Sequence, residues 1–568
     1  MRADHRKSSR YTSTFLGVCV FAVCTALTFF SVTSYAAEDG NAAQQPTKRT
    51  ECTTIIVGKN ASADGTAFYG RTDDGEDFDV TTIKNNPATH HGSEWTYTDP
   101  HNGGQYVLPA NGCQYMSTPQ TASMGDGAWD EAALNEYGVS CTETETIYGG
   151  DAVLAADPYV KTGVAESSMG PIVMPYIHTA KEGVERLGNL INEYGSAEGN
   201  AVMFGDANEL WWMEIYSGHQ WAAVKFPDDK CAVIANDGLI GPIDVSDAEN
   251  VIVSPNLVSI AKDNGFYQET NGKLDLTLTF CEPKRDYAQI RVWAGHKKFS
   301  PSTTGDYDVN KTYDFAFTPD EKISIADAME FLRYRYEDLK YNANKHPEVR
   351  AVGIGRTATA HVINHRGKDL PPILWTCLAN PEMSVFMPVY SNTYYLPSAY
   401  TIDSRDYNPD MAYWKFRRIS ALAMKDRDDF GKSVRNTWRQ KELDLVNNTK
   451  KRDEEYLSAG ATPQAASKIF DEISSDILQT ADALWVDGLE EFMLSTMQDG
   501  TSDASDESYN HINFDAPDDE ESVSMNPFVV SLISAVAGLV VGVGVTVMVV
   551  VSRKNHKKSP SKAQAKKK

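Results

Sequence analysis

Short apolar runs separated by turn residues predict that the folded part of this chain begins with a β-hairpin. The run from Cys52 to Gly58 is rich in β-branched residues and ends in glycine, which predicts a buried strand. Asn60 to Gly65 has the composition of a turn, and Thr66 to Arg71 is the expected returning strand. Turns also separate four further predicted strands, over Ala201–Phe204, Leu210–Ile215, Trp221–Phe226 and Cys231–Ala235.

Helical patterns occur in other parts of the chain. Apolar residues recur at helical spacing between Thr179 and Tyr194, and the stretches Ile325–Leu339 and Ala465–Met497 have the same period. Strands and helices are both abundant, but they do not alternate strictly. The pattern therefore favours an α+β fold over a doubly wound α/β fold.

The N-terminus has the features of an export signal. Basic residues precede an apolar run from Phe15 to Phe30, and Ser34 to Ala36 supplies the small residues that a signal peptidase reads. We therefore expect residues 1–36 to be a signal peptide, with a retained N-terminal anchor as the alternative. Residues 38–51 are poor in apolar side chains, which predicts an unfolded segment.

The C-terminus contains a second candidate membrane segment. Phe528–Val551 is a run of 24 residues without a charge, and about 20 helical residues cross a hydrocarbon core of about 30 Å. The basic residues of the tail, 552–568, favour a cytoplasmic location, and the acidic residues of 499–527 predict a flexible stalk. A buried core helix is the rival interpretation of the apolar run, and its valine and glycine content argues against that. We expect a domain over residues 52–498 that a single span, residues 528–551, holds outside the cell membrane, on a bacterial surface.

Composition and charge exclude several classes of protein. The chain has 568 residues, of which 41% are hydrophobic and 23% charged, and such ordinary globular values exclude collagen, coiled coils and wholesale disorder. The net charge of −25 argues against nucleic acid as a partner. The eight cysteines are too sparse for a disulfide scaffold. Cys113, Cys141, Cys231, Cys281 and Cys377 are expected to be mostly buried small apolar residues, with one disulfide possible.

Cys52 is the candidate nucleophile. It opens the first predicted strand directly after the segment of unfolded character. If the chain is cut between Glu51 and Cys52, the cysteine becomes N-terminal, and its own α-amino group, with an ordinary pKa of about 7.7–8.0, can take the thiol proton. No histidine partner is then required. The alternative is a buried structural cysteine at the start of a strand.

Several motifs occur in a characteristic order along the chain. They read CTTIIVGKNASADGTAFYGRTDDGED from Cys52, then NEYGVS, EYGSAEGN, SGHQWAAVKFPDD and VIAN. In this order the chain resembles the dipeptidases of peptidase family C69, which are N-terminal nucleophile (Ntn) hydrolases similar to penicillin V acylase and bile salt hydrolase. The resemblance runs from Cys52 to about residue 500. It implies an αββα sandwich with extra helices, removal of residues 37–51 as a propeptide, and broad hydrolysis of dipeptides.

The resemblance also implies roles for particular residues. Cys52 corresponds to the nucleophile, and Arg71 and Asp74 match the Arg and Asp after the first hairpin. An arginine beside the thiol lowers the thiol pKa, and Asp74 is expected to orient the free α-amino group. Asn236 in VIAN matches the asparagine whose amide donates to the oxyanion. Two plainer interpretations stay open: Arg71 and Asp74 as a surface ion pair at a turn, and Asn236 as a turn residue.

Further residues are candidates for binding or structural roles. Arg285 and Arg291 are nearly equal matches for a later arginine of bile salt hydrolases. Glu143 and Glu145 lie near the position where the acylases have an asparagine, and a carboxylate there is a hypothetical binding group for the ammonium of a dipeptide. His361 is expected to be a packed or hydrogen-bonded histidine rather than a metal ligand. No motif indicates a metal or another cofactor, so we expect neither.

These inferences together predict a cell-surface cysteine dipeptidase that acts on dipeptides or short peptides. An amidohydrolase of other N-acyl compounds is the runner-up. The alternative from a different class is a non-catalytic binding protein or adhesin on a hydrolase scaffold. Removal of residues 37–51 distinguishes them, because a binding protein has no need to free the amine of Cys52.

Overall fold

The computed structural model describes residues 52–75, 79–120, 127–144 and 147–502. The chain forms two compact units, residues 1–493 and 494–568, and the described part of the second is the end of one helix, residues 494–502. The predicted signal peptide, propeptide and span, with the basic tail, lie outside the described residues, as does nearly all of the predicted stalk. Within the described residues, no helix is long and apolar enough to cross a membrane.

The first sheet contains the strand that follows Cys52. Its six strands are all antiparallel to their neighbours, in the order β14-β1-β2-β19-β20-β21. They are β14 Cys231–Ala235, β1 Thr53–Val57, β2 Ala67–Asp73, β19 Thr359–His365, β20 Ile373–Leu378 and β21 Met387–Tyr390. Strand β1 lies between β14 and β2, so the backbone next to Cys52 is hydrogen-bonded on both sides.

The second sheet has eight antiparallel strands in the order β16-β13-β12-β11-β10-β9-β8-β3. They are β16 Val251–Val253, β13 Trp221–Lys225, β12 Leu210–Ile215, β11 Asn200–Gly205, β10 Ser140–Thr144, β9 Asp130–Asn135, β8 Tyr115–Pro119 and β3 Lys84–Asn86. Three small sheets complete the strands: β15 Pro242–Ile243 with β18 Lys273–Asp275 and β17 Glu269–Thr270, β4 Thr89–His90 with β7 Asn111–Gly112, and β5 Trp95–Thr98 with β6 Gln105–Leu108.

The two large sheets pack face to face. The Tyr69 hydroxyl on β2 lies 2.6 Å from the Ser140 hydroxyl on β10, and the Ser140 hydroxyl lies 2.8 Å from Nε2 of His365 on β19. Successive residues of β12 point to opposite faces of its sheet, because side chains alternate along a strand. Trp212 belongs to the core between the sheets, and Trp211 belongs to a second core on the outer face.

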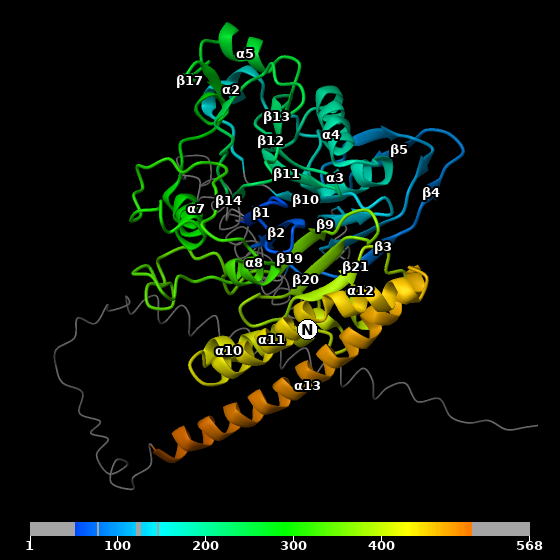
Figure 1. The fold of residues 1–568 in the computed structure, drawn as a ribbon, viewed down its shortest axis with the longest axis vertical. Helices are drawn as coiled ribbons and strands as arrows, with labels where there is room; N and C mark the ends of the chain where they lie inside the picture. Colours follow the sequence, from blue (N-terminus) through cyan, green and yellow to red (C-terminus); the bar gives the residue numbers. More distant parts are fainter. Residues whose placement is uncertain (1–51, 76–78, 121–126, 145–146, 503–568) are drawn as a thin grey trace, which may run out of the picture. The chain divides into compact units, whose positions relative to one another are not determined.

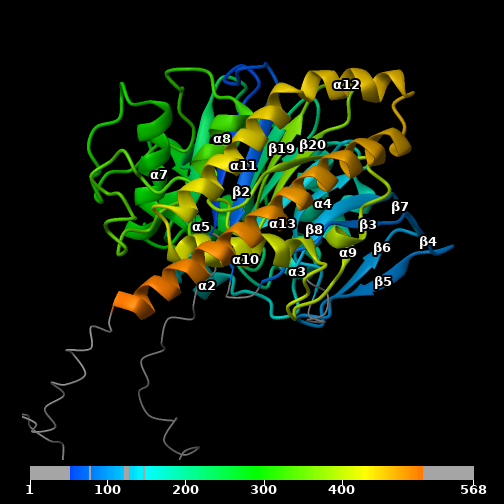
Figure 2. The same ribbon diagram turned by 90° about the horizontal axis from the view of Figure 1, so that it is seen from below.

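Helices cover both outer faces (Figures 1 and 2). Helices α3 and α4 contact the eight-stranded sheet, and α7, α8, α10 and α11 contact the six-stranded sheet. The helices are α2 Asp151–Ala156, α3 Glu166–Val173, α4 Ala180–Tyr194, α5 Leu257–Asp263, α6 Leu276–Phe280, α7 Asp286–Phe299, α8 Ile325–Leu332, α9 Ser398–Thr401, α10 Ala412–Lys425, α11 Phe430–Asn447, α12 Thr449–Ser458 and α13 Pro463–Ser502, with a 3-10 turn at Met174–Tyr176. The result is a helix–sheet–sheet–helix sandwich, which confirms the predicted α+β class.

The predicted elements are mostly present, with one clear error. The hairpin, the four later strands and the helices at 179–194 and 465–497 appear within a few residues of their predicted bounds. The helix predicted over Ile325–Leu339 ends at Leu332 instead. The next residue, Arg333, directs its side chain to Glu442 and Pro381, and Tyr336 has φ +64°, which a helix does not accommodate.

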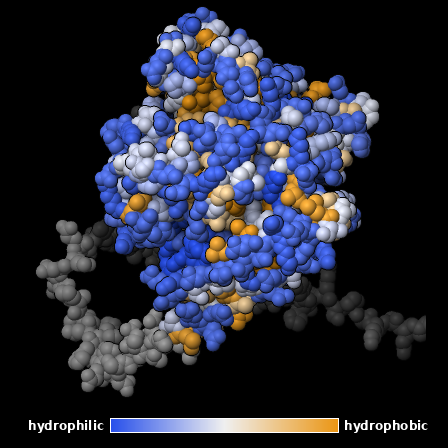
Figure 3. All heavy atoms as spheres, in the orientation of Figure 1, coloured by the Kyte–Doolittle hydropathy of each residue, from blue (hydrophilic) through white to orange (hydrophobic). Residues whose placement is uncertain are grey.

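The visible surface of the protein is mainly polar. The face shown in Figure 3 is mainly hydrophilic, with apolar groups scattered over it. The six cysteines in the described part of the chain are all free, so no disulfide forms among them.

Candidate active site

Cys52 is held at the start of β1, inside the protein. Cys52 is only 4% exposed to solvent. The Cys52 carbonyl accepts a hydrogen bond of 2.8 Å from Arg291 Nη1, and the Thr53 amide donates to the Thr72 hydroxyl at 3.1 Å. The backbone on the C-terminal side of the cysteine is therefore fixed by contacts from a helix and from the neighbouring strand.

Arg71 on β2 contacts the thiol directly. Its Nη1 lies 3.2 Å from the Cys52 sulfur. The same guanidinium forms an ion pair with Glu131 and donates from Nε to the Thr142 hydroxyl at 3.1 Å. Glu166 lies 4.0 Å from Nη1. Since these partners belong to the opposite sheet and helix α3, Arg71 bridges the two sheets beside the candidate nucleophile.

The pKa of the Cys52 thiol depends on opposing influences. Burial raises the pKa to about 11, against the lowering effect of Arg71, and the carboxylates of Asp73, Asp74 and Glu166 raise it further. Burial therefore outweighs the lowering that was expected from Arg71. The thiol of the uncut chain is protonated at neutral pH, and a base is needed to make the thiolate.

Asp74 is buried and tightly held. Its carboxylate accepts hydrogen bonds from Arg350 Nη2 at 2.6 Å and from the Thr357 hydroxyl at 2.5 Å, and Arg356 donates to its backbone carbonyl at 2.6 Å. Arg71 and Asp74 are both fully buried, so the interpretation as a surface ion pair is wrong. The expected role of Asp74 in orienting the α-amine stays a prediction.

Asp73 is a residue that the sequence interpretation missed. Strand pairing places Thr72 opposite Thr53, so Asp73 is level with Cys52 on the adjacent strand. Its Oδ2 is buried and has no hydrogen-bond partner in the part of the chain that the structure describes. Burial raises the Asp73 pKa to about 7, although Arg71 lowers it. Strand alternation was the available signal, because it places Arg71 and Asp73 on one face of β2.

Asn236 lies directly after β14, level with Cys52 from the other side. The pair Ala235–Thr53 sets this register. Asn236 has φ +36°, in the left-handed region that asparagine tolerates better than most residues. Its Oδ1 accepts a hydrogen bond of 2.6 Å from Arg291 Nη2, and its buried Nδ2 has no acceptor among the described residues. A free amide donor thus lies at the position where the predicted oxyanion donor was expected.

The structure distinguishes the two later arginines. Arg291 on α7 contacts the Cys52 carbonyl, the Thr53 hydroxyl and Asn236. Arg285, just before α7, forms an ion pair with Asp237 at 3.2 Å and donates to the Asn236 carbonyl. Arg291 is therefore the arginine that joins the candidate nucleophile to Asn236.

Two further buried groups lie near this site. Glu143 has a pKa well above the ordinary value because it is buried beside Asp130 and Glu166, and its Oε1 has no partner among the described residues. His361 lies opposite Arg71 on β19, and both of its ring nitrogens are likewise without described partners. Burial and the charge of Arg71 hold the His361 pKa well below its ordinary range, so its ring is neutral. Glu145 lies outside the described residues.

Metal ligands are not grouped in this region. Across the described ranges, no set of three or more histidine, cysteine, aspartate or glutamate side chains is arranged to hold a metal ion. The chemistry available at the site is that of a thiol, a guanidinium, an amide donor and several carboxylates.

Sequence comparison gives the family. The sequence model of peptidase family C69 matches residues 51–440. The chain belongs to peptidase family C69. The family match begins one residue before Cys52 and includes Arg71, Asn236 and Arg291.

Curated relatives agree with this family. A probable dipeptidase B of Streptococcus pyogenes serotype M3 is 33% identical over 452 residues, which is 75% of this chain and 89% of that protein. A probable dipeptidase of Salmonella dublin is 34% identical over 351 residues, 60% of this chain and 80% of that protein. A solved variant of conjugated bile acid hydrolase from Clostridium perfringens matches at 10% identity and a TM-score of 0.27, covering 61% of this chain and 94% of that one.

Proposed function

We propose that this chain is a cysteine dipeptidase whose nucleophile is Cys52, freed as an N-terminal residue by cleavage of the Glu51–Cys52 bond. The observation that carries the proposal is the position of Cys52, directly before a central strand and with Arg71 Nη1 3.2 Å from its sulfur. Membership of family C69 and relatives that are named probable dipeptidases support it. The Ntn-hydrolase fold is part of this proposal, and the helix–sheet–sheet–helix layers are consistent with it.

The freed α-amine supplies the base that the buried thiol requires. It takes the thiol proton, and the thiolate attacks the carbonyl carbon of the dipeptide, so that a C–S bond forms and the carbonyl electrons move to oxygen. The unpartnered Asn236 Nδ2 donates a hydrogen bond to this oxyanion. The intermediate then breaks its C–N bond, and the leaving amino acid takes the proton from the ammonium of Cys52. Water attacks the remaining thioester with the amine again as base, and the first amino acid leaves as the thiol re-forms.

The carboxylates around the thiol favour a substrate with a free amino group. Asp73, Glu131 and Glu166 are all buried within the surroundings of Arg71 and Cys52. Asp73 Oδ2 and Glu143 Oε1 have no hydrogen-bond partner among the described residues, and although burial raises the pKa of both carboxyl groups, an ammonium beside them favours their ionised forms. The ammonium of a dipeptide is adjacent to the carbonyl that is attacked, so a carboxylate near the sulfur can bind it. An N-acyl compound lacks this charge, which favours the dipeptidase over the amidohydrolase.

The decisive experiment is the mass of the mature protein, measured together with its activity. Wild-type protein is expected to begin at Cys52 and to hydrolyse dipeptides, and Cys52→Ala is expected to be inactive. An active protein that begins at Ala37 or Glu38 would contradict the mechanism, since the amine of Cys52 would still be in a peptide bond. An inert protein with that start would favour the binding-protein alternative.

Substrate comparison separates the two enzymatic candidates. We expect a dipeptide to be cleaved about 10- to 150-fold faster, in kcat/KM, than the same dipeptide acetylated at its amine, since a lost charged hydrogen bond costs about 1.5–3 kcal/mol. Equal rates would favour an amidohydrolase of N-acyl compounds. Glu143→Ala tests the ammonium site that was proposed from the sequence, and an unchanged KM for dipeptides would exclude Glu143 from it.

The location at the cell surface is a separate part of the proposal. It rests on residues 1–36, on the uncharged run Phe528–Val551 and on the basic tail that follows. Fractionation of the native host, followed by protease treatment of intact cells, tests it. The protein is expected in the membrane fraction with its catalytic domain accessible to protease. Release of the full chain into the medium would contradict the anchor.

A further inference from the structure

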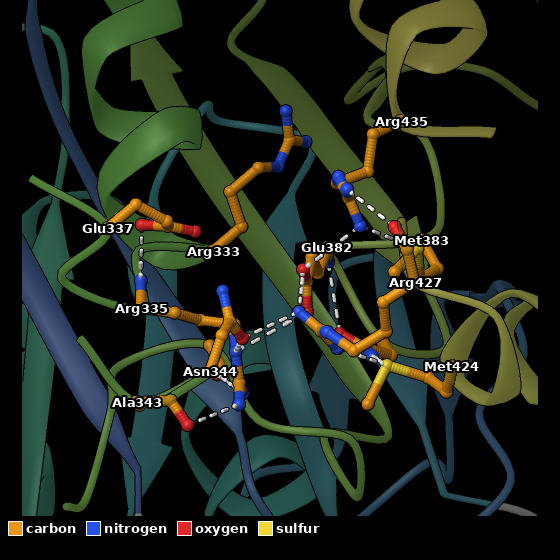
Figure 4. Close-up of polar contacts among 12 residues, drawn as sticks. Arg333, Arg335, Glu337, Ala343, Asn344, Glu382, Met383, Met424, Arg427 and Arg435 are labelled. Atoms are coloured by element: carbon orange, nitrogen blue, oxygen red, sulfur yellow. Dashed lines mark hydrogen bonds and ion pairs between the residues drawn. The ribbon is translucent and has the colours of Figure 1, made fainter. Parts of the chain in front are cut away.

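A cluster of arginines surrounds one buried carboxylate away from the thiol. Arg335, Arg427 and Arg435, here called the arginine cluster, surround Glu382 (Figure 4). Arg335 Nε lies 3.7 Å from Glu382 Oε2. Arg435 Nη1 lies 3.5 Å from Glu382 Oε1, and Arg427 forms an ion pair with the same oxygen. The cluster joins the segment after α8 to the connection between α10 and α11 and the start of α11.

The positive charge of the cluster exceeds the negative charge that it contacts. Three guanidinium groups share the single carboxylate of Glu382, whose side chain is 3% exposed. Arg333 is close in sequence, but its side chain points away (Figure 4) and pairs with Glu442. Glu337 is exposed and accepts a hydrogen bond from the Arg335 backbone amide at 3.2 Å. The three guanidinium groups repel one another, and an additional anion relieves that repulsion.

Two donors of the cluster face thioether sulfurs, whereas others donate to the Asn344 side-chain oxygen and to backbone carbonyls. Arg427 Nη1 lies 2.8 Å from the Met424 sulfur, and Arg435 Nη1 lies 3.9 Å from the Met383 sulfur. A thioether sulfur is a weak hydrogen-bond acceptor, whereas a guanidinium forms short, strong bonds to oxyanions. The side chains of Arg335, Arg427 and Arg435 are 13%, 23% and 21% exposed, so a small ion can reach them from solvent.

We propose that the arginine cluster binds a tetrahedral dianion of the phosphate or sulfate class. Planar guanidinium groups offer paired donors that match the oxygens of such an ion. Residues 52 to 552 hold 74 acids against 39 bases, so this positive site is not explained by the average charge of that part of the chain. The proposal is independent of the reaction at Cys52.

The position of the cluster gives the ion a structural effect. Arg335 also donates from Nη1 to the Gly353 carbonyl at 2.7 Å. Arg350 and Thr357 lie in the same segment, three residues before and four residues after Gly353. Both donate hydrogen bonds to the Asp74 carboxylate. An ion that fixes Arg335 therefore stabilises the segment on which Asp74 depends.

The site is tested by calorimetric titration of the purified full chain. Inorganic phosphate and sulfate are titrated separately, at constant ionic strength. Saturable binding of one ion per chain is expected, with a rise in Tm. Arg427→Gln and Arg435→Gln are expected to weaken binding by ~10-fold or more, because each removes a charged hydrogen bond. Lys441→Gln is the matched control, since Lys441 pairs with Asp476 at 2.7 Å on the surface and lies outside the cluster. The ion that binds more tightly shows whether the site prefers phosphate or sulfate.

A second variant keeps the test valid if the arginine variants do not fold. Glu382→Gln removes the internal carboxylate and leaves three guanidinium groups without it, so phosphate is expected to raise its Tm more than that of the wild type. An equal or smaller rise would overturn the proposal. Absence of saturable binding to the wild type, binding that persists in both arginine variants, or acetate binding as tightly as phosphate would also overturn it.

Discussion

Arg71 Nη1 lies 3.2 Å from the sulfur of Cys52, which directly precedes β1, and Arg71 lies 19 positions later on the adjacent strand β2. The guanidinium also reaches the opposite sheet through Thr142 and Glu131. The position of the thiol relative to its cationic neighbour is therefore set both by local chain geometry and by the packing of the two sheets.

Replacing Arg71 with lysine is expected to lower kcat/KM by about 10²-fold, within the range seen when a group that stabilises charge in the transition state is removed. Lysine keeps the charge but cannot contact Cys52, Thr142 and Glu131 together. The rate of thiol alkylation as a function of pH should show a higher thiol pKa in Arg71→Lys. Arg366→Lys is the control, because Arg366 is also an ion-paired arginine with a side chain only 6% exposed, but it pairs with Asp453. Unchanged activity in Arg71→Lys would contradict this role.

Asn236 can be tested with two substitutions of opposite meaning. Asn236→Asp keeps the oxygen that accepts from Arg291 but replaces the free donor, so kcat should fall by about 10²–10³-fold with little change in KM. Asn236→Gly suits the φ of +36°. If Asn236 is only a turn residue, the glycine variant keeps its activity, whereas the oxyanion role requires both variants to lose it. Steady-state kinetics on both variants decides between these outcomes.

Asp73→Asn is expected to stabilise the protein at alkaline pH while impairing activity. The folded-state pKa of Asp73 is about 7, above an ordinary value of 3.8, so the native state holds this proton more tightly than the unfolded state. The contribution of this proton to the unfolding free energy of the wild type is fully present below pH 4 and is lost as the pH rises through 7. At pH 8 the variant should be more stable by up to about 4 kcal/mol, and at pH 4 the difference should vanish. Urea unfolding at both pH values measures this, and no gain at pH 8 would contradict the buried, unpaired carboxylate.

His365 is expected to contribute to acid sensitivity. Burial lowers its pKa to about 4, so as pH falls below 6.5 the unfolded state takes up a proton that the native state does not. The unfolding free energy should therefore decrease between pH 6.5 and 4, by up to about 3 kcal/mol from this residue. His365→Gln, which can still bond to the Ser140 hydroxyl, should reduce this decrease. Equal pH profiles for wild type and His365→Gln would refute the expectation.

The parts of the site that are close in sequence were predictable. Cys52, Arg71 and Asp74 belong to one hairpin and its exit, so a local pattern of strand, turn and strand was enough to bring them together. Strand pairing was also needed to see Asp73, because its position level with Cys52 depends on the register of β1 and β2. Asn236 and Arg291 required the long-range pairing of β14 with β1 and the packing of α7, which spacing alone does not reveal.

The region between residues 340 and 460 shows where the sequence pattern is insufficient. Strands β19, β20 and β21 are buried on both faces, since helices cover one face and the second sheet covers the other. Such strands lack the alternation of apolar and polar residues that marks a half-exposed strand.

The end of α8 was also not predictable from the sequence pattern. The chain bends after α8, where Arg333 contacts Glu442, more than 100 residues away. The helical period of the sequence continues beyond this bend, so the period alone does not mark the end of the helix.

Strand β1 lies in the interior of its sheet, between β14 and β2, and this has a practical consequence for anyone producing the protein. Under the proposed mechanism, anything fused ahead of Cys52 occupies the nitrogen that must act as the base. An affinity tag or reporter at that end would abolish turnover even in a perfectly folded protein, unless it is removed at the Glu51–Cys52 bond. Folding assays would report such a preparation as sound, so the number of active sites should be titrated with a thiol-directed covalent inhibitor before any specific activity is compared.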